Sequence, residues 1–278
     1  MIRRFAGRTI VVTGSGRNKG LGQAILQRFA DEGANCVVSD LGTPADHMGA
    51  GDIGTTAEME EIARELRQRG AKVATFTCDV RSEKSCDALA RKCLETFGSL
   101  DIWVNNAGIG YIMKPLLETS ASEWEAVIGV NLSGAFYGTK AAARVMIEQG
   151  KGGRIINIAS QAAKSGFPHM APYTSSKHGM IGLTRSNAIE LGPHGITVNA
   201  VCPNHVTTGL GAKQNEYFSK LLGFESVEAY LENMKRKNPL GRPGLGSDTA
   251  AACAWLASDD AVYVTGESLN VSGGEEMH

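Results

Sequence analysis

The first forty residues constrain the fold most strongly, because they read as strand, glycine-rich turn, helix and strand in direct succession. A β-branched run over 8–13 indicates the first strand, and an apolar run over 35–40 indicates the second. Between them, residues 23–33 carry apolar side chains at helical spacing. The turn contains glycines at positions 14, 16, 20 and 22. Glycines let a backbone approach phosphate groups and a helix N-terminus offers free N–H groups, so this arrangement is typical of a dinucleotide pyrophosphate site.

The rest of the chain continues the alternation of strands and helices. Further strands are predicted at 72–78, 101–105, 154–159, 197–201 and 268–271, and helices at 82–97, 124–147, 171–191 and 247–257. The capping-box pattern of Ser120 and Glu123 precedes the second of these helices. This alternation predicts one α/β domain over residues 1–278, a Rossmann-like, doubly wound parallel sheet flanked by helices. Ligands of such sheets bind beyond the carboxyl ends of the strands.

Asp40 ends the second predicted strand, where a carboxylate can accept hydrogen bonds from the adenosine ribose of a dinucleotide. The same charge repels the 2′-phosphate of NADP, so the sequence favours NAD as the cofactor. A solvated acid at a strand end is the alternative reading of Asp40.

Tyr173 and Lys177 are four residues apart on the predicted helix over 171–191, which places them one turn apart on one face. A lysine ammonium near a phenol favours the phenolate, so we expect the pKa of Tyr173 to be lowered. Ser160 can hold a substrate oxygen against the phenol. The three side chains together predict proton transfer to or from a carbonyl/alcohol pair.

These features and several short motifs together resemble the short-chain dehydrogenase/reductase family, and the resemblance runs from Thr13 to Gly274. The remaining motifs are Asp79-Val80, Asn105 to Gly108, Asn131, Pro203 to Thr208 and Asn270 to Gly274. Two departures stand out. Five residues separate Gly14 from Gly20 where the family usually has three, and Asn204 follows Pro203 where the family usually has glycine. Asparagine tolerates a positive φ, so we expect the turn at Asn204 to survive.

The resemblance implies roles for individual residues. The implied catalytic residues are Asn131, Ser160, Tyr173 and Lys177. The implied NAD-binding residues are Gly14, Asn18, Gly20, Leu21, Gly22, Asp40, Asp79, Val80, Asn106, Ala107, Gly108, Tyr173, Lys177, Pro203, Val206 and Thr208. Tyr173 is expected to act as the general acid/base, Lys177 to bind the nicotinamide ribose, and Asn131 to hold a water that connects Lys177 to solvent.

The substrate site is defined less sharply by the sequence. Its expected residues are Ser160, Gln161, His169, Tyr173 and His205, with Ile109, Tyr111, Met113, Phe167 and Met170 as further pocket positions. Residues 207–239 carry enough apolar side chains for two short helices, and we expect them to form a substrate lid. The glycine-rich segment 42–55 reads as an insertion that covers the adenine end, contacts another subunit or forms a surface loop.

Composition excludes several other classes of function. The net charge is −1, with 28 basic and 29 acidic residues, so no basic excess points to a nucleic-acid partner. No apolar run is long enough to span a membrane. The six cysteines form no C-x-x-C pair and no cluster with metal-ligand spacing, so we expect no metal site and a reducing cytoplasm.

The predicted function is NAD-dependent interconversion of a secondary alcohol and a ketone by hydride transfer, on a small-molecule substrate. One alternative is a divergent enoyl reductase. The resemblance disfavours it, because that branch is associated with a Tyr-x6-Lys spacing and this chain has Tyr-x3-Lys. Another is an NAD-binding regulator without catalysis. The family resemblance also implies a homotetramer, paired through the helices over 124–147 and 171–191. Their apolar side chains Phe136, Tyr137, Met146, Met180, Ile181 and Leu183 exceed what one sheet face needs.

Overall fold

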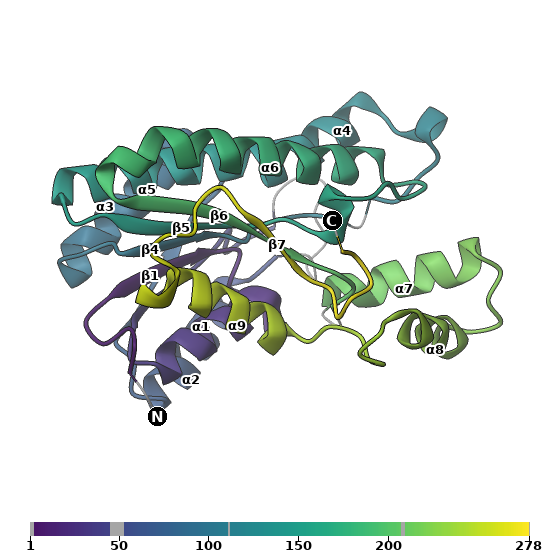
Figure 1. Cartoon of the computed structure of the whole chain (residues 1–278), viewed down its shortest axis with the longest axis horizontal. Coiled ribbons are helices and arrows are strands. Elements are labelled where there is room, and N and C mark those ends of the chain that lie inside the picture. Colours follow the sequence, from purple (N-terminus) through teal and green to yellow (C-terminus); the bar gives the residue numbers. More distant parts are fainter. Residues whose placement is uncertain (1–2, 45–52, 111, 207–208, 278) are drawn as a thin grey trace.

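The computed structural model describes residues 3–44, 53–110, 112–206 and 209–277. In this part of the chain, seven parallel strands form a single sheet in the order β3-β2-β1-β4-β5-β6-β7 (Figure 1). The strands are β1 (Thr9–Thr13), β2 (Asn35–Asp40), β3 (Val73–Thr77), β4 (Ile102–Asn105), β5 (Gly153–Ile158), β6 (Ile196–Pro203) and β7 (Ser268–Val271). The order reverses between β1 and β4, which confirms the predicted doubly wound sheet.

Helices cover both faces of the sheet (Figure 1). One face carries α1 (Leu21–Asp31), α2 (Thr56–Gln68) and α9 (Gly246–Ala257), and the other carries α3 (Glu83–Phe97), α5 (Gly134–Gln149) and α6 (Ala171–Leu191). Successive side chains of β1 therefore point to opposite faces of the sheet. Ile10 and Val12 pack in the core with α1, α2 and α9, and Val11 packs in the core with α3, α5 and α6. The inner strands are buried on both faces and read as mainly apolar runs, which explains why their ends lie within two residues of the predicted ones.

The long helix predicted over 124–147 contains an interruption. It consists of α4 (Ala121–Ile128), a π-helical turn at Gly129–Ser133, and α5. The predicted capping box is confirmed, because the Ser120 hydroxyl accepts a hydrogen bond from the Glu123 N–H at 3.2 Å and the Glu123 carboxylate accepts one from the Ser120 N–H at 3.0 Å. The helix accordingly begins directly after Ser120.

Helix α2 was missed by the sequence analysis. It follows the glycine-rich segment 42–55, whose two ends meet where the Gly42 N–H donates to the Gly54 carbonyl at 3.0 Å. A capping box of Thr55 and Glu58 begins the helix. The end of the segment packs against the glycine turn, since a Cβ built at Gly54 would lie 2.4 Å from the carbonyl carbon of Gly16. Residues 45–52 of this segment lie outside the described part of the chain.

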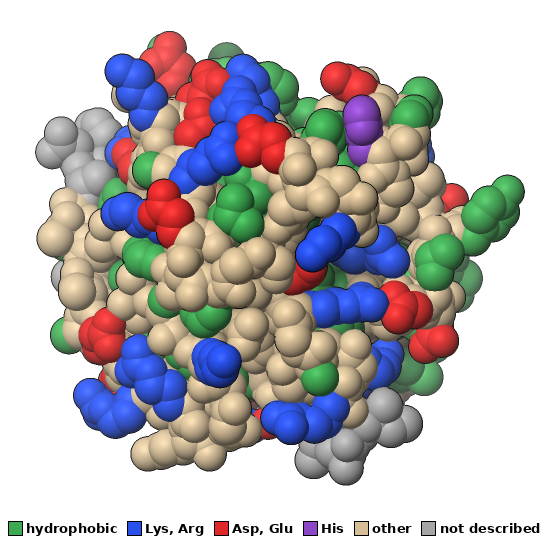
Figure 2. All heavy atoms as spheres, turned by 90° about the vertical axis from the view of Figure 1, so that its left-hand side faces the viewer, with side chains coloured by type: hydrophobic (Ala, Val, Ile, Leu, Met, Phe, Trp, Pro, Cys, Tyr) green, Lys and Arg blue, Asp and Glu red, His purple; other side chains and the backbone are tan. Residues whose placement is uncertain are grey.

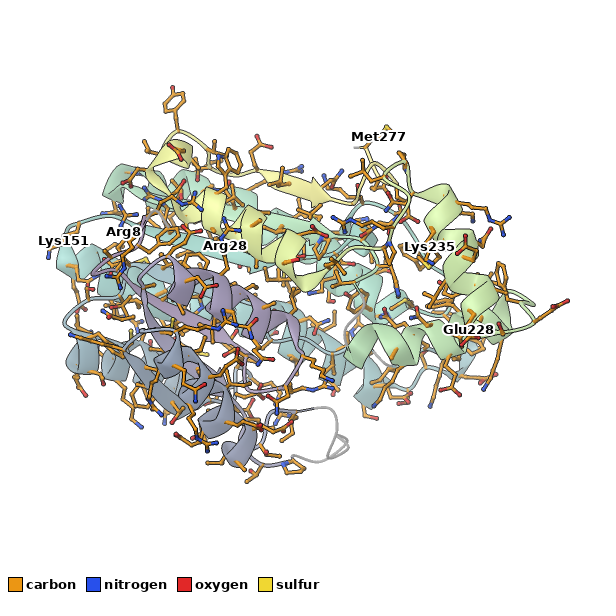
Figure 3. All side chains as sticks on the ribbon, turned by 90° about the horizontal axis from the view of Figure 1, so that it is seen from below. Arg8, Arg28, Lys151, Glu228, Lys235 and Met277 are labelled. Atoms are coloured by element: carbon orange, nitrogen blue, oxygen red, sulfur yellow. The ribbon has the colours of Figure 1, made fainter. Side chains whose placement is uncertain are left out.

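Two helices extend the molecule beyond the carboxyl ends of the strands (Figure 1). They are α7 (Gly209–Leu221) and α8 (Val227–Lys237), which confirms the prediction of two short helices between 207 and 239. They pack on each other and enclose a small core of Met170, Phe218 and Tyr230. The C-terminal segment returns to the same end of the molecule, since Met277 and Lys235 of α8 both lie at the end opposite Lys151 (Figure 3).

The surface opposite this helix pair carries acidic and basic side chains in mixture (Figure 2). This agrees with the balanced composition of the chain. No described helix is long and apolar enough to cross a lipid bilayer.

Candidate active site

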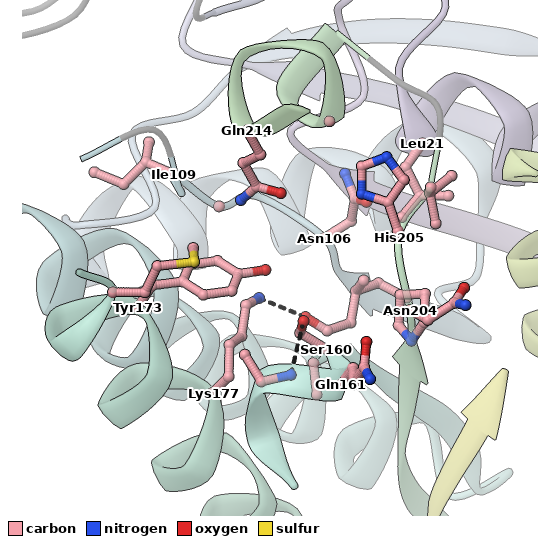
Figure 4. Close-up of a pocket in the computed structure, with 18 of the residues that line it drawn as sticks. Leu21, Asn106, Ile109, Ser160, Gln161, Tyr173, Lys177, Asn204, His205 and Gln214 are labelled. Carbon is pink, nitrogen blue, oxygen red and sulfur yellow. Dashed lines mark hydrogen bonds between the residues drawn. The ribbon is translucent and has the colours of Figure 1, made fainter. Parts of the chain in front are cut away.

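A cavity of about 640 Å³ lies at the carboxyl ends of the strands, between the sheet and the α7–α8 pair. Most of the residues that the sequence assigned to a site line it (Figure 4). They are Gly14, Asn18, Gly20, Leu21, Asp40, Asp79, Val80, Asn106, Ala107, Gly108, Ser160, Gln161, Tyr173, Lys177, Pro203, His205 and Val206. Gly22, Asn131 and His169 do not line the cavity, and Thr208 lies outside the described residues.

One hydrogen-bonded clamp joins the turns after β1 and β4. The Thr13 hydroxyl accepts hydrogen bonds from the backbone N–H groups of Asn106 and Ala107, each at 3.2 Å. In return, Asn106 Nδ2 donates to the carbonyls of Thr13 and Gly14, each at 2.9 Å. Gly14 has φ +64°, and a Cβ there would lie 2.6 Å from the Cα of Ala107. Only glycine satisfies both conditions, because other residues rarely adopt this φ and none fits the gap.

The start of α1 borders the cavity through Gly20 and Leu21. No side chain caps this helix and no acid lies in its first turn, so its first N–H groups and positive dipole end remain available to an anion. Gly22 lies behind the turn, where a Cβ would meet Ser15 at 2.7 Å. This glycine therefore allows α1 to pack closely against the turn. The donor set and the space fit a dinucleotide pyrophosphate.

Asp40 is buried at the end of β2 and lines the cavity. Its carboxylate accepts hydrogen bonds from the backbone N–H groups of Gly16 at 3.0 Å and Leu41 at 2.8 Å. Burial raises the pKa of this carboxyl above its usual value, although these bonds, a backbone bond from Gly54 and the charge of Arg17 act in the opposite direction. Arg17 also lines the cavity, and the sequence analysis gave it no role.

Asp79 and Val80 lie on the same side of the cavity as Asp40, after β3. The guanidinium of Arg81 donates hydrogen bonds to both oxygens of the Asp79 carboxylate, the shortest from Nε at 2.9 Å and from Nη2 at 2.7 Å. This pairing lowers the pKa of Asp79. Val80 packs on α5, since a Cβ at Gly134 would lie 2.8 Å from its Cγ2.

Tyr173 and Lys177 lie on the first turns of α6 and face Ser160 across the cavity floor (Figure 4). Lys177 Nζ is 5.5 Å from the centroid of the Tyr173 ring and donates a hydrogen bond to the Ile158 carbonyl at 2.7 Å. Ser160 follows β5 in extended backbone, and its hydroxyl accepts a hydrogen bond from the Ala162 N–H at 3.1 Å. The predicted grouping of these three side chains is therefore found.

The predicted direction of the Tyr173 pKa shift is wrong for this structure. Burial raises the pKa of the phenol above its ordinary value, and a hydrogen bond with Ser160 acts in the opposite direction. Lys177 is itself almost fully buried, and burial lowers its pKa to about 8. Removing both groups from water disfavours both charged forms, so desolvation outweighs the proximity that the sequence argument relied on.

Asn131 lies inside the π-helical turn and is fully buried. Its Oδ1 accepts a hydrogen bond from the Ile109 N–H at 2.8 Å, and its Nδ2 donates to the Ile109 carbonyl and the Ser176 hydroxyl, each at 3.0 Å. A Cβ at Gly108 would lie 3.4 Å from this Oδ1 and 3.7 Å from Lys177 Nζ. Asn131 therefore fixes the segment after β4 directly beside Lys177.

The two predicted substrate histidines have different outcomes, and the turn at Asn204 also differs from expectation. His169 has φ +62° and contacts Tyr217 of α7, with 2.8 Å between its Nδ1 and the phenol oxygen, instead of lining the cavity. His205 lines the cavity, and burial lowers its pKa. The expected positive φ at Asn204 is absent.

Asn204 instead joins the end of β6 to the C-terminal segment. Its Nδ2 donates to the Ser272 carbonyl and the Glu275 carboxylate, each at 3.0 Å. Asn238, which follows α8, donates to the same Ser272 carbonyl at 3.0 Å. Glu275 consequently lines the cavity, a contact that no local motif in the sequence signals.

The expected pocket positions divide in the same way. Ile109, Phe167 and Met170 line the cavity, whereas Met113 only packs against the core beside it, and Tyr111 lies outside the described residues. Gln214, Asn233 and Met234 line the cavity without having been singled out. Within the described part of the chain, no group of three or more His, Cys, Asp or Glu is placed to hold a metal ion.

The buried ammonium of Lys177 predicts a particular pH dependence of stability. In the folded protein Lys177 loses its proton near pH 8, whereas in an unfolded chain it does so near pH 10.5. Between these values the unfolded chain binds more protons, so the contribution of Lys177 to the free energy of unfolding increases as the pH rises. Lys177→Met removes that contribution. Urea unfolding at several pH values between 8 and 10 should show wild type gaining stability relative to Lys177→Met. Lys151→Met, an exposed control, should follow wild type, and parallel pH profiles for all three proteins would contradict the assignment.

Comparison with known proteins agrees with this architecture. A family model described as Enoyl-(Acyl carrier protein) reductase, within the short-chain dehydrogenases/reductases, matches residues 14–276. The chain is 38% identical over 272 residues to 3beta-hydroxysteroid dehydrogenase 1 of Eggerthella lenta, covering 98% of this chain and 95% of that protein. It is 34% identical over 280 residues to glucose 1-dehydrogenase 2 of Bacillus subtilis, covering 100% and 98%.

A solved structure extends the likeness to three dimensions. The crystal structure of carveol dehydrogenase from Mycobacterium avium in complex with NAD superimposes with a TM-score of 0.90 at 32% identity, covering 98% of each chain. With the matching fold, the glycine turn and the Tyr173–Lys177 pair, the chain belongs to the short-chain dehydrogenase/reductase family of oxidoreductases.

Proposed function

We propose that this protein interconverts a secondary alcohol and a ketone by hydride transfer, with NAD as the cofactor. One observation carries the proposal, namely that Ser160, Tyr173 and Lys177 lie together in a cavity bordered by an uncapped helix N-terminus. Relatives named for hydroxysteroid, glucose and carveol dehydrogenation support the same reaction class. A nicotinamide dinucleotide would accept or supply the hydride when bound.

The protein's own residues would control the proton. Ser160 would hold the substrate oxygen, and Tyr173 would remove the hydroxyl proton in the oxidation direction and return it in the reduction direction. Lys177 would bind the nicotinamide ribose. Asn131 would fix the position of the neighbouring segment and hold the water that links Lys177 to solvent.

The cofactor would lie across the clamp between the turns after β1 and β4. Its pyrophosphate would meet the N–H groups at Gly20 and Leu21, with Asn18 at the edge. Asp79 and Val80 would flank the adenine, and Asn106, Ala107 and Gly108 would line the cleft. Pro203 and Val206 would contact the nicotinamide end, and Thr208 is proposed there from the sequence alone.

Replacing Tyr173 by Phe should abolish turnover while leaving NADH binding within a few-fold of wild type. Only the hydroxyl is lost, and general acid–base catalysis typically contributes about 100-fold or more. Turnover followed by NADH absorbance and binding followed by fluorescence measure the two effects. Tyr137→Phe, on a half-buried residue of α5 outside the cavity, is the matched control. Near-normal turnover in Tyr173→Phe would refute the mechanism.

A preference for NAD over NADP is proposed from Asp40. Its buried carboxylate lies where the adenosine ribose would bind, and a 2′-phosphate there would be repelled by about 1–3 kcal/mol, which is about tenfold or more in specificity. Arg17 lies near this carboxylate, because its charge opposes the rise in the Asp40 pKa. We therefore propose that Asp40 outweighs Arg17 in the choice of cofactor.

The variant Asp40→Asn tests this balance. It removes the charge and keeps one of the two oxygens. The Gly16 and Leu41 N–H groups bond different oxygens of Asp40, so one of these two hydrogen bonds is lost, and thermal unfolding verifies that the variant remains folded. The ratio of kcat/KM for NAD and NADP should fall several-fold, because Arg17 would then face the 2′-phosphate without competition. Asp79→Asn should leave the ratio unchanged. A wild type that uses both cofactors equally would disprove the proposal.

Two other functions are separated from this one by a simple assay. The description of the matching family model raises an enoyl reductase. That activity would oxidise NADH with an unsaturated acyl thioester and leave secondary alcohols untouched. A non-catalytic regulator would bind NAD and turn over neither substrate. The Tyr-x3-Lys spacing of Tyr173 and Lys177 favours alcohol oxidation.

A homotetramer is proposed from the family, with a weaker basis in this chain than the sequence suggested. Met146, Met180 and Ile181 are buried in the protein's own core, while Phe136 remains exposed. Trp124 and Ile147 of the same long helix are also exposed. Light scattering behind a sizing column should give about four times the 29.4 kDa chain mass, and a mass near one chain would contradict this.

All six cysteines are free and buried, which supports a reducing cytoplasm as the proposed location.

A further inference from the structure

The part of the cavity that faces the helix pair is apolar. Five side chains from α7, the following turn and α8 form what we term the α7–α8 wall: Phe218, Leu222, Phe224, Tyr230 and Met234. Phe218 and Tyr230 are buried in one cluster with Met170, and the ring of Tyr173 packs against that cluster. A substrate oxygen held at Tyr173 would therefore carry its carbon body directly onto an apolar surface.

Three of the polar side chains near this wall, Gln214, Asn204 and Glu275, are already engaged within the protein. Gln214 Nε2 donates to the Gly110 carbonyl at 3.0 Å, and Asn204 Nδ2 is shared between Ser272 and Glu275. A polyol needs a partner for each buried hydroxyl, and every hydroxyl left without one costs free energy. Hydroxyls of a sugar that face Phe218, Leu222, Phe224 and Met234 would therefore find no partner on these side chains.

Charge also argues against an ionic substrate. Apart from Lys177 and the side chains that border the proposed cofactor half (Arg17, Asp40, Asp79 and Arg81), the charged side chains among the described lining residues are Lys237 and Glu275, and their signs are opposite. His205 adds a neutral ring, because burial lowers its pKa, and its Nε2 has no hydrogen-bond partner in the described part of the chain. An anionic group such as a phosphate would find no net positive field on this wall.

We propose, resting on the alcohol dehydrogenase function above, that the substrate is a bulky, uncharged and mainly apolar secondary alcohol or its ketone. Its reacting oxygen lies at Ser160 and Tyr173, and its body extends along the α7–α8 wall. A small number of further polar groups can be bound by Gln161, His205 and Asn233. We expect a sugar, or an acyl thioester with phosphate groups, to be a much poorer substrate.

Two adjacent leucines at the end of α7 provide a matched test. Leu222 lines the cavity, whereas Leu221 does not. Both side chains are substantially exposed, at 56% and 40%, so neither substitution should disturb the core. Leu222 would contact only a substrate long enough to reach the end of α7. Its contribution should therefore grow with the size of the substrate.

The experiment compares kcat/KM with NAD for decahydro-2-naphthol, cyclohexanol and xylitol, using wild type, Leu222→Asn and Leu221→Asn. Wild type should prefer decahydro-2-naphthol to xylitol by about 100-fold or more. Leu222→Asn should lower kcat/KM for decahydro-2-naphthol by about three- to tenfold, with a smaller loss for cyclohexanol. Leu221→Asn should stay within about twofold of wild type for all three alcohols.

The outcomes separate this inference from the proposed function. If xylitol is oxidised as well as decahydro-2-naphthol or better, the substrate class is wrong while the alcohol dehydrogenase function stands. Equal effects of Leu222→Asn and Leu221→Asn would also overturn the placement of the substrate body. If no alcohol in a broader panel reduces NAD or NADP, the proposed function itself fails. Thermal unfolding of both variants verifies that activity is compared between folded proteins.

Discussion

The rest of the structure depends on the clamp in which Thr13 and Asn106 tie the turns after β1 and β4 to each other. These turns lead their chains to opposite faces of the sheet, so without a bond between them the crevice at the centre would have no fixed width. The Thr13 hydroxyl and the Asn106 amide provide four hydrogen bonds, and Gly14 removes the Cβ that would force the turns apart. The helix N-terminus of α1 and the Tyr173 side chain are thereby held on either side of one cavity.

The sequence predicts this half of the molecule well, because its signals are local. Strands covered on both faces must be apolar throughout, and a helix that begins at Ser120 needs the capping partner found three residues later. Helix α2 was missed although its sequence carries two local signals. The buried residues Met59, Ile62, Ala63 and Leu66 have amphipathic helical spacing, and the capping box of Thr55 and Glu58 precedes them. The π-helical turn at Gly129–Ser133 has no comparable signature, since its residues suit an α-helix equally.

The candidate site was predictable to the extent that its residues belong to such local motifs. Tyr173, Lys177 and Ser160 come together because α6 connects β5 to the neighbouring strand β6. Its first turns therefore lie beside the carboxyl end of β5, which Ser160 follows. The direction of the Tyr173 pKa shift was not predictable, because it depends on how much water the surrounding elements exclude. His169 and Glu275 show the same limit, since the contact of one with α7 and the approach of the other to the cavity are set by segments distant in sequence.

The carbonyl oxygen of Ser272 links the end of α8 to the residue that follows β6. Asn204 and Asn238 both donate to this one oxygen, and Gly273 fits so tightly that a Cβ there would lie 2.4 Å from the Asn238 side chain. The end of α8 and the end of β6 are therefore held at one point through a single oxygen, whereas α7 contacts the body elsewhere, through Gln214 and Tyr217. A substitution at Asn238 would consequently loosen the end of α8 without touching the residues proposed for proton transfer.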